Sequence, residues 1–486
     1  MMTPRTYTVI RALALIGLLL APVLGACSAI PATGERSFTG FMGPADEARV
    51  GREQHPEIVR AFGGAYADRR VQDYVTRVGQ SIARVTETPE LRFTFTVLDS
   101  PVVNAFALPG GYVYVTRGLM AIASDEAELA GVIAHEIGHV TARHAARRYS
   151  QQVVAGVGTA VVGVITGSDD IAETFSFGAS AVLQSYSRDQ EFEADTLGVR
   201  YLGRAGYAVE AMGTFLAKLD RQSSLEAELA GRPPGEVDGL NIMATHPRTP
   251  DRVERASAQS GAGRRERDAY LQIVDGLVFG DDPDHGLVRG RSFIHPRLGI
   301  RFDVPQGFRL ASGTRQVIAQ SANGATIVFD SSRSEPIAMT EYLRTVWGRS
   351  LTLAEIERLQ VDGFDAATAS TRIQTRRGPL DLRLVAVRVD ASVHRFLYLT
   401  PPALTPILAA DLRRTTLSFR RLTPAETTAA RPQRIRLHTV TTGETRAHLI
   451  ELMAPDAGRD RRFDIMNGLA PGATPAAGTV VKVVAE

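Results

Sequence analysis

The chain has 486 residues, which is more than one hydrophobic core usually serves, so about two to four domains are expected. A hydrophobic content of 44% with 22% charged residues is ordinary for globular proteins and excludes a chain that is disordered throughout. The formal net charge of +2 is close to neutral and gives no case for a nucleic-acid partner.

The first 26 residues have the pattern of a secretory signal peptide. Arginines precede an apolar run at 12–24, and small residues follow it. The run is shorter than the roughly 20 residues of a transmembrane helix. The stretch Leu24-Gly25-Ala26-Cys27 resembles the lipobox of bacterial lipoproteins, and Cys27 is the only cysteine of the chain. Since Ser28 follows it rather than aspartate, the resemblance implies lipidation of Cys27 and anchoring to the outer membrane, facing the periplasm.

The next segments predict helices and a small sheet. Residues 44–88 place apolar residues at spacings of three and four, which predicts helices. Residues 92–100 alternate as a strand, and a Pro-Gly-Gly turn at 109–111 leads into a further strand, Tyr112–Thr116. Ser124 is expected to open a helix with acidic residues in its first turn, and helices are expected to follow to about residue 260.

The helix that opens at Ser124 carries a motif with metal-ligand spacing. His135 and His139 are four positions apart and so share one face, because each helical residue advances about 100°. Glu136 lies beside them, placed to act on water bound to a cation. This H-E-x-x-H spacing predicts a zinc site with Glu136 as the general base, and a structural histidine pair is the alternative.

A catalytic zinc also needs a third protein ligand and an open position for water. The stretch "SYSRDQEFEADTLG" at 185–198 offers three acids. On a helix Glu193 points about 200° away from Glu191, so Glu193 is expected to be a solvated or ion-paired acid. Of Glu191 and Asp195, one would bind the cation and the other would accept a hydrogen bond from a ligand imidazole. Helical geometry leaves the order of these two roles open.

These motifs together resemble metallopeptidase family forty-eight, the zinc proteases that include HtpX and the CaaX-prenyl proteases. "HEIGH" at 135–139 and "EFEAD" at 191–195 carry the resemblance, and "NAFALPGGYVYVTRGL" and "THPRTPDRV" agree with it. It covers about residues 45–260. It implies a mainly helical, zincin-type domain in which Glu191 is the third zinc ligand and Asp195 lies behind the ligands. Without expected transmembrane helices, the chain is more similar to the periplasmic lipoprotein branch.

Three further residues follow from the same motifs. In the periplasmic relatives the His-Pro motif approaches the metal, so the resemblance implies that His246 either takes the fourth position in a resting state or assists the oxyanion. Arg252 is expected to anchor this segment or to contact substrate. His144, five positions after His139, lies off the ligand face of a continuous helix and is expected to be structural.

The predicted strand at 112–116 indicates how substrate would bind. Tyr112, Val113 and Tyr114 are expected to line an open edge to which an extended polypeptide adds as a further strand. Backbone hydrogen bonding implies weak sequence specificity, which suits unfolded or misassembled cell-envelope proteins, as the resemblance also implies. The alternative is a latent protease that serves as an envelope scaffold or holdase through its C-terminal modules.

The expected architecture is multidomain α+β. After the signal peptide at 1–26 come a zinc protease domain at 27–262, a linker with a short helix at 263–292, an α+β domain at 293–420, a linker at 421–432 and a small module at 433–486. The stretch "IRFDVPQGF" gives the α+β domain a weak similarity to PsbP-like or Mog-like folds. The last module resembles LysM, a βααβ fold that binds peptidoglycan, through Val440, Gly443, Thr445, Ile450, Asn467, Gly478 and Val481. Glu444 replaces the usual aspartate, so peptidoglycan is a partner only if the module has kept its affinity for glycan.

Overall fold

The structure, a computed structural model, describes residues 27–151, 185–229, 231, 242, 246, 252, 261–313, 316–333, 336–375 and 378–486. Contacts divide the chain into two units. Unit 1 is Met1–Leu277 with Ile435–Ala485, and unit 2 is Val278–Arg434 with Glu486. The expected signal peptide and the side chain of Cys27 lie outside the described residues. None of the described helices is long and apolar enough to cross a bilayer.

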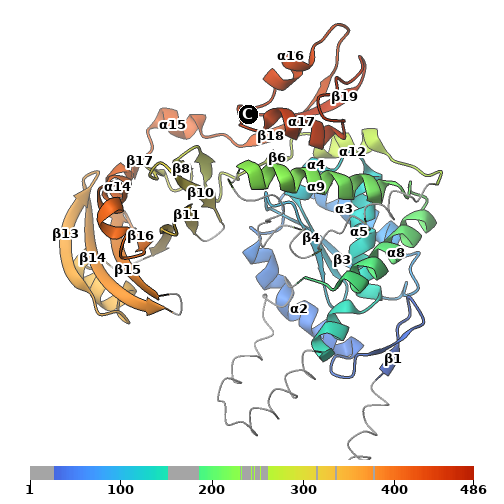
Figure 1. Ribbon diagram of the computed structural model, residues 1–486, viewed down its shortest axis with the longest axis horizontal. Helices are drawn as coiled ribbons and strands as arrows, with labels where there is room; N and C mark the ends of the chain where they lie inside the picture. The colour runs from blue at the N-terminus through green and yellow to red at the C-terminus, as the bar shows by residue number, and fades with distance from the viewer. Residues whose placement is uncertain are drawn as a thin grey trace, which may run out of the picture. The chain divides into compact units, whose positions relative to one another are not determined.

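Unit 1 is arranged around helix α5 (Glu126–Thr141), which carries the H-E-x-x-H residues (Figure 1). The helix begins one residue later than expected, because Asp125 rather than Ser124 is its N-cap and accepts a hydrogen bond from Glu128 N at 2.9 Å. The helices packed against α5 include α3 (Arg69–Ala83), α8 (Arg188–Arg204) and α9 (Ala211–Leu229). The unit also contains α2 (Pro44–Ala61), α4 (Arg117–Ile122) and α12 (Arg267–Val274).

A three-stranded sheet completes this part of unit 1, in the order β3 (Thr94–Leu98), β5 (Tyr112–Thr116), β4 (Ala105–Leu108). Strand β5 lies in the centre, parallel to β3 and antiparallel to β4. Its backbone is therefore paired on both sides, and the expectation that Tyr112, Val113 and Tyr114 form an open edge for substrate is wrong. The edge beside α5 belongs to β4. A separate hairpin, β1 (Cys27–Ala29) with β2 (Arg36–Phe38), precedes α2.

The C-terminal segment has the expected βααβ order, but from Ile435 to Ala485 it belongs to unit 1. Its elements are β18 (Gln433–Thr439), α16 (Arg446–Glu451), α17 (Arg459–Asn467) and β19 (Val480–Ala485). Helix α17 contacts α4 and α9, and Figure 1 shows it beside them. The expected separate module at 433–486 is therefore packed on the protease part of the chain, and its binding to glycan stays a prediction.

The chain's two lysines make polar contacts near the start of α5, and one of them, Lys482, joins this segment to α4. Lys482 Nζ, on β19, donates to the carbonyl oxygens of Ala121, in the last turn of α4, at 2.7 Å and of Ala123, just after α4, at 2.5 Å. Lys218 Nζ, on α9, donates to Ser124 Oγ at 2.6 Å and Glu128 Oε2 at 2.5 Å. Both lysines are buried. Lys482 thus links the C-terminal segment to the residues that precede α5.

Unit 2 is built on a seven-stranded antiparallel sheet in the order β10-β11-β12-β16-β15-β14-β13, with a four-stranded sheet in the order β17-β9-β8-β7. The strands of these two sheets are β7 (Leu287–Arg289), β8 (Ser292–His295), β9 (Ile300–Asp303), β10 (Phe308–Ser312), β11 (Val317–Ser321), β12 (Thr326–Arg333), β13 (Ala354–Val361), β14 (Phe364–Thr375), β15 (Gly378–Val389), β16 (Ser392–Thr400) and β17 (Arg420–Arg421). The short strand β6 (Val278–Phe279) pairs instead with Gln433 and Arg434 at the start of β18. The helices are α13 (Met339–Glu341), a π-helical turn (Tyr342–Trp347), α14 (Thr405–Ser418) and α15 (Pro424–Ala429).

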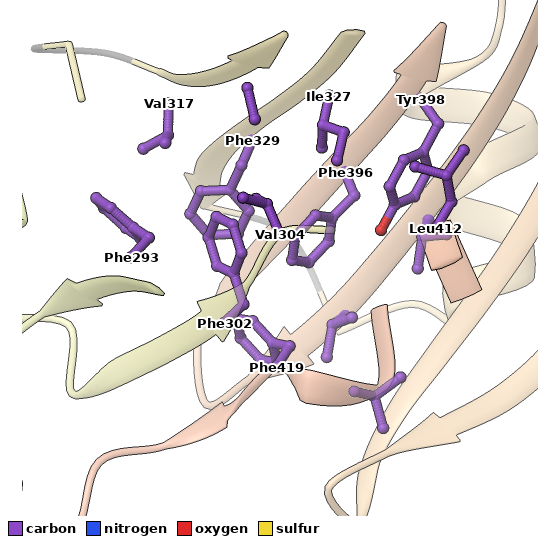
Figure 2. Close-up of a cluster of buried hydrophobic side chains, with 14 of the residues drawn as sticks. Phe293, Phe302, Val304, Val317, Ile327, Phe329, Phe396, Tyr398, Leu412 and Phe419 are labelled. Carbon is purple, nitrogen blue, oxygen red and sulfur yellow. The ribbon is translucent and has the colours of Figure 1, made fainter. Parts of the chain in front are cut away.

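Phenylalanines from both sheets form the core of unit 2 (Figure 2). Phe329 lies 4.7 Å from Phe302 and 4.8 Å from Phe396 between ring centroids. Parts of both expected linkers also belong to unit 2. Strand β7, inside 263–292, pairs with β8, and Glu426, inside 421–432, forms ion pairs with Arg301 and Arg420. Unit 2 accordingly starts at Val278 rather than at residue 293.

Candidate zinc site

Two glycines allow the helices that carry the site to approach closely. A Cβ on Gly138 of α5 would lie 3.0 Å from Ala194 O, and a Cβ on Gly198 of α8 would lie 3.1 Å from His135 N. Side chains at these positions would push the helices apart. Helix α8 starts with a capping box in which Ser187 accepts from Gln190 N, so that Glu191 lies in its first turn facing α5.

Four buried side chains converge at this helix crossing: His135, His139, Glu191 and His246. Their potential ligand atoms all lie within 4.8 Å of one another. His135 Nε2 is 3.0 Å from His139 Nε2 and 3.3 Å from His246 Nδ1, and His139 Nε2 is 3.5 Å from Glu191 Oε1. Zinc–nitrogen distances of about 2.0–2.1 Å in a tetrahedron separate donor atoms by about 3.3 Å, so these residues fit a zinc ion.

The surroundings of the cluster favour the deprotonated forms of His139 and Glu191. Burial and the neighbouring histidines hold the pKa of His139 well below its ordinary range, which keeps its imidazole neutral. Burial alone would raise the pKa of Glu191, but His246, His135 and Arg252 lower it below its usual value. Glu191 therefore remains a carboxylate, as a metal ligand must.

Asp195 and Arg252 lie directly behind the cluster. Asp195 Oδ1 is 2.9 Å from His135 Nδ1, the position expected for a carboxylate that orients a ligand imidazole. Arg252 donates to Asp195 through Nε at 2.6 Å and Nη2 at 2.8 Å, and its Nη1 is 2.5 Å from Glu191 Oε2. Its side chain is only 3% exposed. Of the two roles that the sequence leaves open for Arg252, the geometry favours anchoring over substrate contact.

Glu136 is placed beside the cluster without a hydrogen-bond partner. Both its carboxylate oxygens are buried and have none among the described residues, and His246 Nε2 lies 3.5 Å from Oε1. Burial raises the pKa of Glu136, although His246 and His135 oppose this effect. A buried carboxylate without a partner is costly in a folded protein, which indicates that its partner is a group that enters the site.

Sequence reasoning missed two neighbours of His139. His144, expected to lie off the site, is in contact with His139, with 2.7 Å between their Nδ1 atoms. The ring of Tyr186 stacks on His139 with 3.9 Å between centroids, and both residues line a small cavity with Ala107 and Leu108 of β4. The sequence offers no signal for Tyr186, because this residue lies outside α8 and meets His139 only through tertiary packing.

A helix with H-E-x-x-H, a carboxylate from a second helix and an unpartnered glutamate beside them together define a zincin-type zinc metallopeptidase site. The family comparison agrees with this class, since residues 69–260 match peptidase family M48. This part of the chain is thus similar to peptidase family M48, and it holds a cluster of side chains that could bind a metal ion.

Similar proteins carry names of the same class. The chain is 32% identical over 217 residues to a putative beta-barrel assembly-enhancing protease of Vibrio cholerae, covering 43% of each chain. It is 31% identical to the beta-barrel assembly-enhancing protease of Escherichia coli K12, covering 39% of each. The mitochondrial metalloendopeptidase OMA1 of Schizosaccharomyces pombe is 28% identical, over 43% of this chain and 59% of that one. The match thus spans less than two thirds of each relative.

Among solved structures, a cyanobacterial PsbP from Synechocystis sp. PCC 6803 covers 28% of this chain and 98% of its own. Its sequence identity is 14% and its TM-score 0.23, which is too low a likeness to assign a fold.

Proposed function

We propose that this protein is a lipid-anchored zinc endopeptidase of the periplasm, attached to the outer membrane, that cleaves misfolded or misassembled envelope proteins. The buried, unpartnered carboxylate of Glu136 beside four converging ligand atoms carries the catalytic part of the proposal. The names of the bacterial relatives support envelope proteins as substrates. The lipobox-like stretch that ends at Cys27 supports the lipid anchor.

Each residue of the site has a distinct task in this proposal. His135, His139 and Glu191 would hold the zinc ion, which when bound supplies a Lewis acid for the scissile carbonyl and lowers the pKa of water. Asp195 accepts a hydrogen bond from His135 Nδ1–H, which keeps the proton on Nδ1 and leaves Nε2 free to bind metal. Glu136 takes a proton from the attacking water at its carboxylate and donates it to the leaving amine.

His246 takes the fourth ligand position in a resting form of the site. Its Nδ1 lies 2.9 Å from Glu191 Oε1 and 3.3 Å from His135 Nε2, so it points to the same centre as the other ligands. A catalytic zinc site keeps one position open, and four protein ligands are typical of closed sites. Activation then requires His246 to withdraw. This arrangement favours the resting-state role of His246 over direct help to the oxyanion.

Substrate is proposed to bind along β4. This strand is the sheet edge next to α5, and its residues Ala107 and Leu108 line a cavity with His139 and Tyr186. An extended polypeptide added to β4 would lie beside the metal ligands. Main-chain hydrogen bonds would provide most of the affinity, which fits unfolded substrates of varied sequence.

Hydrolysis of casein by the purified, zinc-loaded full chain tests the proposal. The wild type is expected to cleave slowly, His246→Ala faster, and Glu136→Gln not at all, since the amide cannot accept the proton. A scaffold or holdase is the second candidate, favoured by the closed four-ligand arrangement. It would prevail if neither the wild type nor His246→Ala cleaves casein while both bind zinc.

A further inference from the structure

The two histidines of the H-E-x-x-H motif are supported by different groups. His135 Nδ1 faces a carboxylate, Asp195 Oδ1, at 2.9 Å. His139 Nδ1 instead faces another imidazole, His144 Nδ1, at 2.7 Å, with 4.8 Å between the ring centroids. His144 is fully buried. Its Nε2 lies 3.1 Å from Glu193 Oε2.

The backbone after α5 explains why His144 reaches His139. On a continuous helix a residue five positions along would point about 140° away. Helix α5 ends at Thr141, and Arg143 adopts a left-handed φ of 54°, so the chain leaves the α-helical path before His144. A non-glycine residue in this region costs about 1–2 kcal/mol. Arg143 is held there by hydrogen bonds to Glu47 Oε2 at 3.0 Å and to the Met42 carbonyl at 2.7 Å.

The order of protons along these contacts follows from the chemistry of each atom. His139 must present the lone pair of Nε2 to a metal, so its proton lies on Nδ1 and is donated to His144 Nδ1. His144 then carries its own proton on Nε2 and donates it to Glu193 Oε2. Arg147 Nη1 donates to the same carboxylate oxygen at 2.7 Å, so the end of the series is an ion pair. Each hydrogen bond has one allowed direction.

We propose that His144 and Glu193 are positioning residues that hold His139 in the tautomer and orientation needed to bind zinc. Glu193 is the acid that helical phase excludes as a ligand, and it acts on the metal through two imidazoles. The supporting groups behind a metal ligand typically change metal affinity by about 10–100-fold when removed. The inference rests on the proposed zinc site and adds residues that have no contact with the metal.

Zinc affinity of the purified full chain, measured by competition with a chromophoric chelator, tests this role. His144→Leu, which removes both hydrogen bonds, is expected to weaken zinc binding about 10–100-fold. His144→Gln, which keeps an acceptor and a donor, should recover part of the loss. Glu193→Leu should weaken binding less than His144→Leu does. The absorption spectrum of the cobalt-substituted chain should change in both leucine variants, because the orientation of His139 shifts.

His55→Leu is the matched control, since His55 Nδ1 is hydrogen-bonded to Tyr114 OH at 2.7 Å and not to a ligand. It should lower the free energy of unfolding without changing zinc affinity. Urea unfolding of the metal-free variants separates the two effects. Unchanged zinc affinity in His144→Leu and Glu193→Leu overturns the inference; should His144→Leu not fold, Glu193→Leu and His144→Gln decide it. A wild type that binds no zinc overturns the proposed function itself.

Discussion

Replacing Arg252 by methionine is expected to destabilise the metal-free protein by about 3–5 kcal/mol, the usual cost of leaving a buried charge without its partner. Arg252 forms ion pairs at 2.5 Å with Glu191 and 2.6 Å with Asp195, and the three side chains are 3%, 1% and 12% exposed. Burial would raise the pKa of Asp195, but hydrogen bonds from Arg252 and His135 lower it well below its usual range. Without Arg252, the two neighbouring carboxylates of Glu191 and Asp195 repel each other in a medium of low dielectric. The loss in the free energy of unfolding should therefore lie towards the upper end of this range.

Urea unfolding of the chelator-treated chain, followed by circular dichroism, measures this loss. Arg200→Met is the control, because Arg200 is 40% exposed and its pair with Glu87 at 3.2 Å should contribute at most about 1 kcal/mol. Saturating zinc should recover part of the Arg252→Met loss, since a cation beside Glu191 replaces the missing charge. The loss should also shrink as pH falls and the carboxylates become protonated. Equal losses in both variants, or a loss that zinc does not reduce, would refute charge neutralisation as the role of Arg252.

Three further predictions concern other parts of the chain. Burial, with His295 and Arg421, lowers the pKa of His394 from 6.5 to about 4. As the pH falls, the unfolded chain therefore binds a proton before the folded chain does. The free energy of unfolding of unit 2 should decrease by about 2 kcal/mol between pH 8 and pH 5. Fluorescence of Trp347, the only tryptophan, follows this unfolding, and an equal pH slope in His394→Gln would contradict it. Asn467→Leu should lower the free energy of unfolding by about 2–4 kcal/mol, because the Asn467 side chain is hydrogen-bonded to the N–H and C=O of Lys482 at 2.7 and 2.9 Å. Hydrogen exchange of the amides in β19 should also become faster, and unchanged exchange would argue against this role of Asn467. Gly198→Val should force α8 away from α5, lower the free energy of unfolding by about 1–3 kcal/mol and weaken zinc binding. Gly203→Val, on the same helix, is the control and should leave zinc affinity unchanged.

The parts of the site within one helix could be predicted from sequence, and the parts that depend on tertiary packing could not. The spacing of His135 and His139 is enough to place both on one face, because helical geometry is local. Choosing Glu191 over Asp195 required the family resemblance, since the choice depends on how α8 crosses α5. His144 was misplaced because nothing in the pattern shows that Arg143 leaves the helix with a φ of 54°.

The order of strands in a sheet also could not be predicted from the sequence. Alternation of side chains predicts that 112–116 is a strand, but it does not say that β3 and β4 lie on either side of it. In unit 2 the strands β13 and β14 are hard to predict from the sequence. β13 is largely exposed, and the buried residues of β14 are mostly alanines, so neither shows a strong apolar alternation. The expected linkers contained β6 and the last residue of β17, whose partner strands, β18 and β9, lie far away in the chain.

The zinc content of the purified chain, compared between the wild type, Glu136→Gln and Glu191→Ala, tests the central claim most directly. The account predicts one zinc ion per chain in the wild type and in Glu136→Gln, because Glu136 acts on water and does not hold the metal. It predicts loss of zinc in Glu191→Ala, because that change removes the only carboxylate among the four converging ligands. A wild type without zinc, or a Glu191→Ala variant that binds zinc as tightly as the wild type, would contradict it.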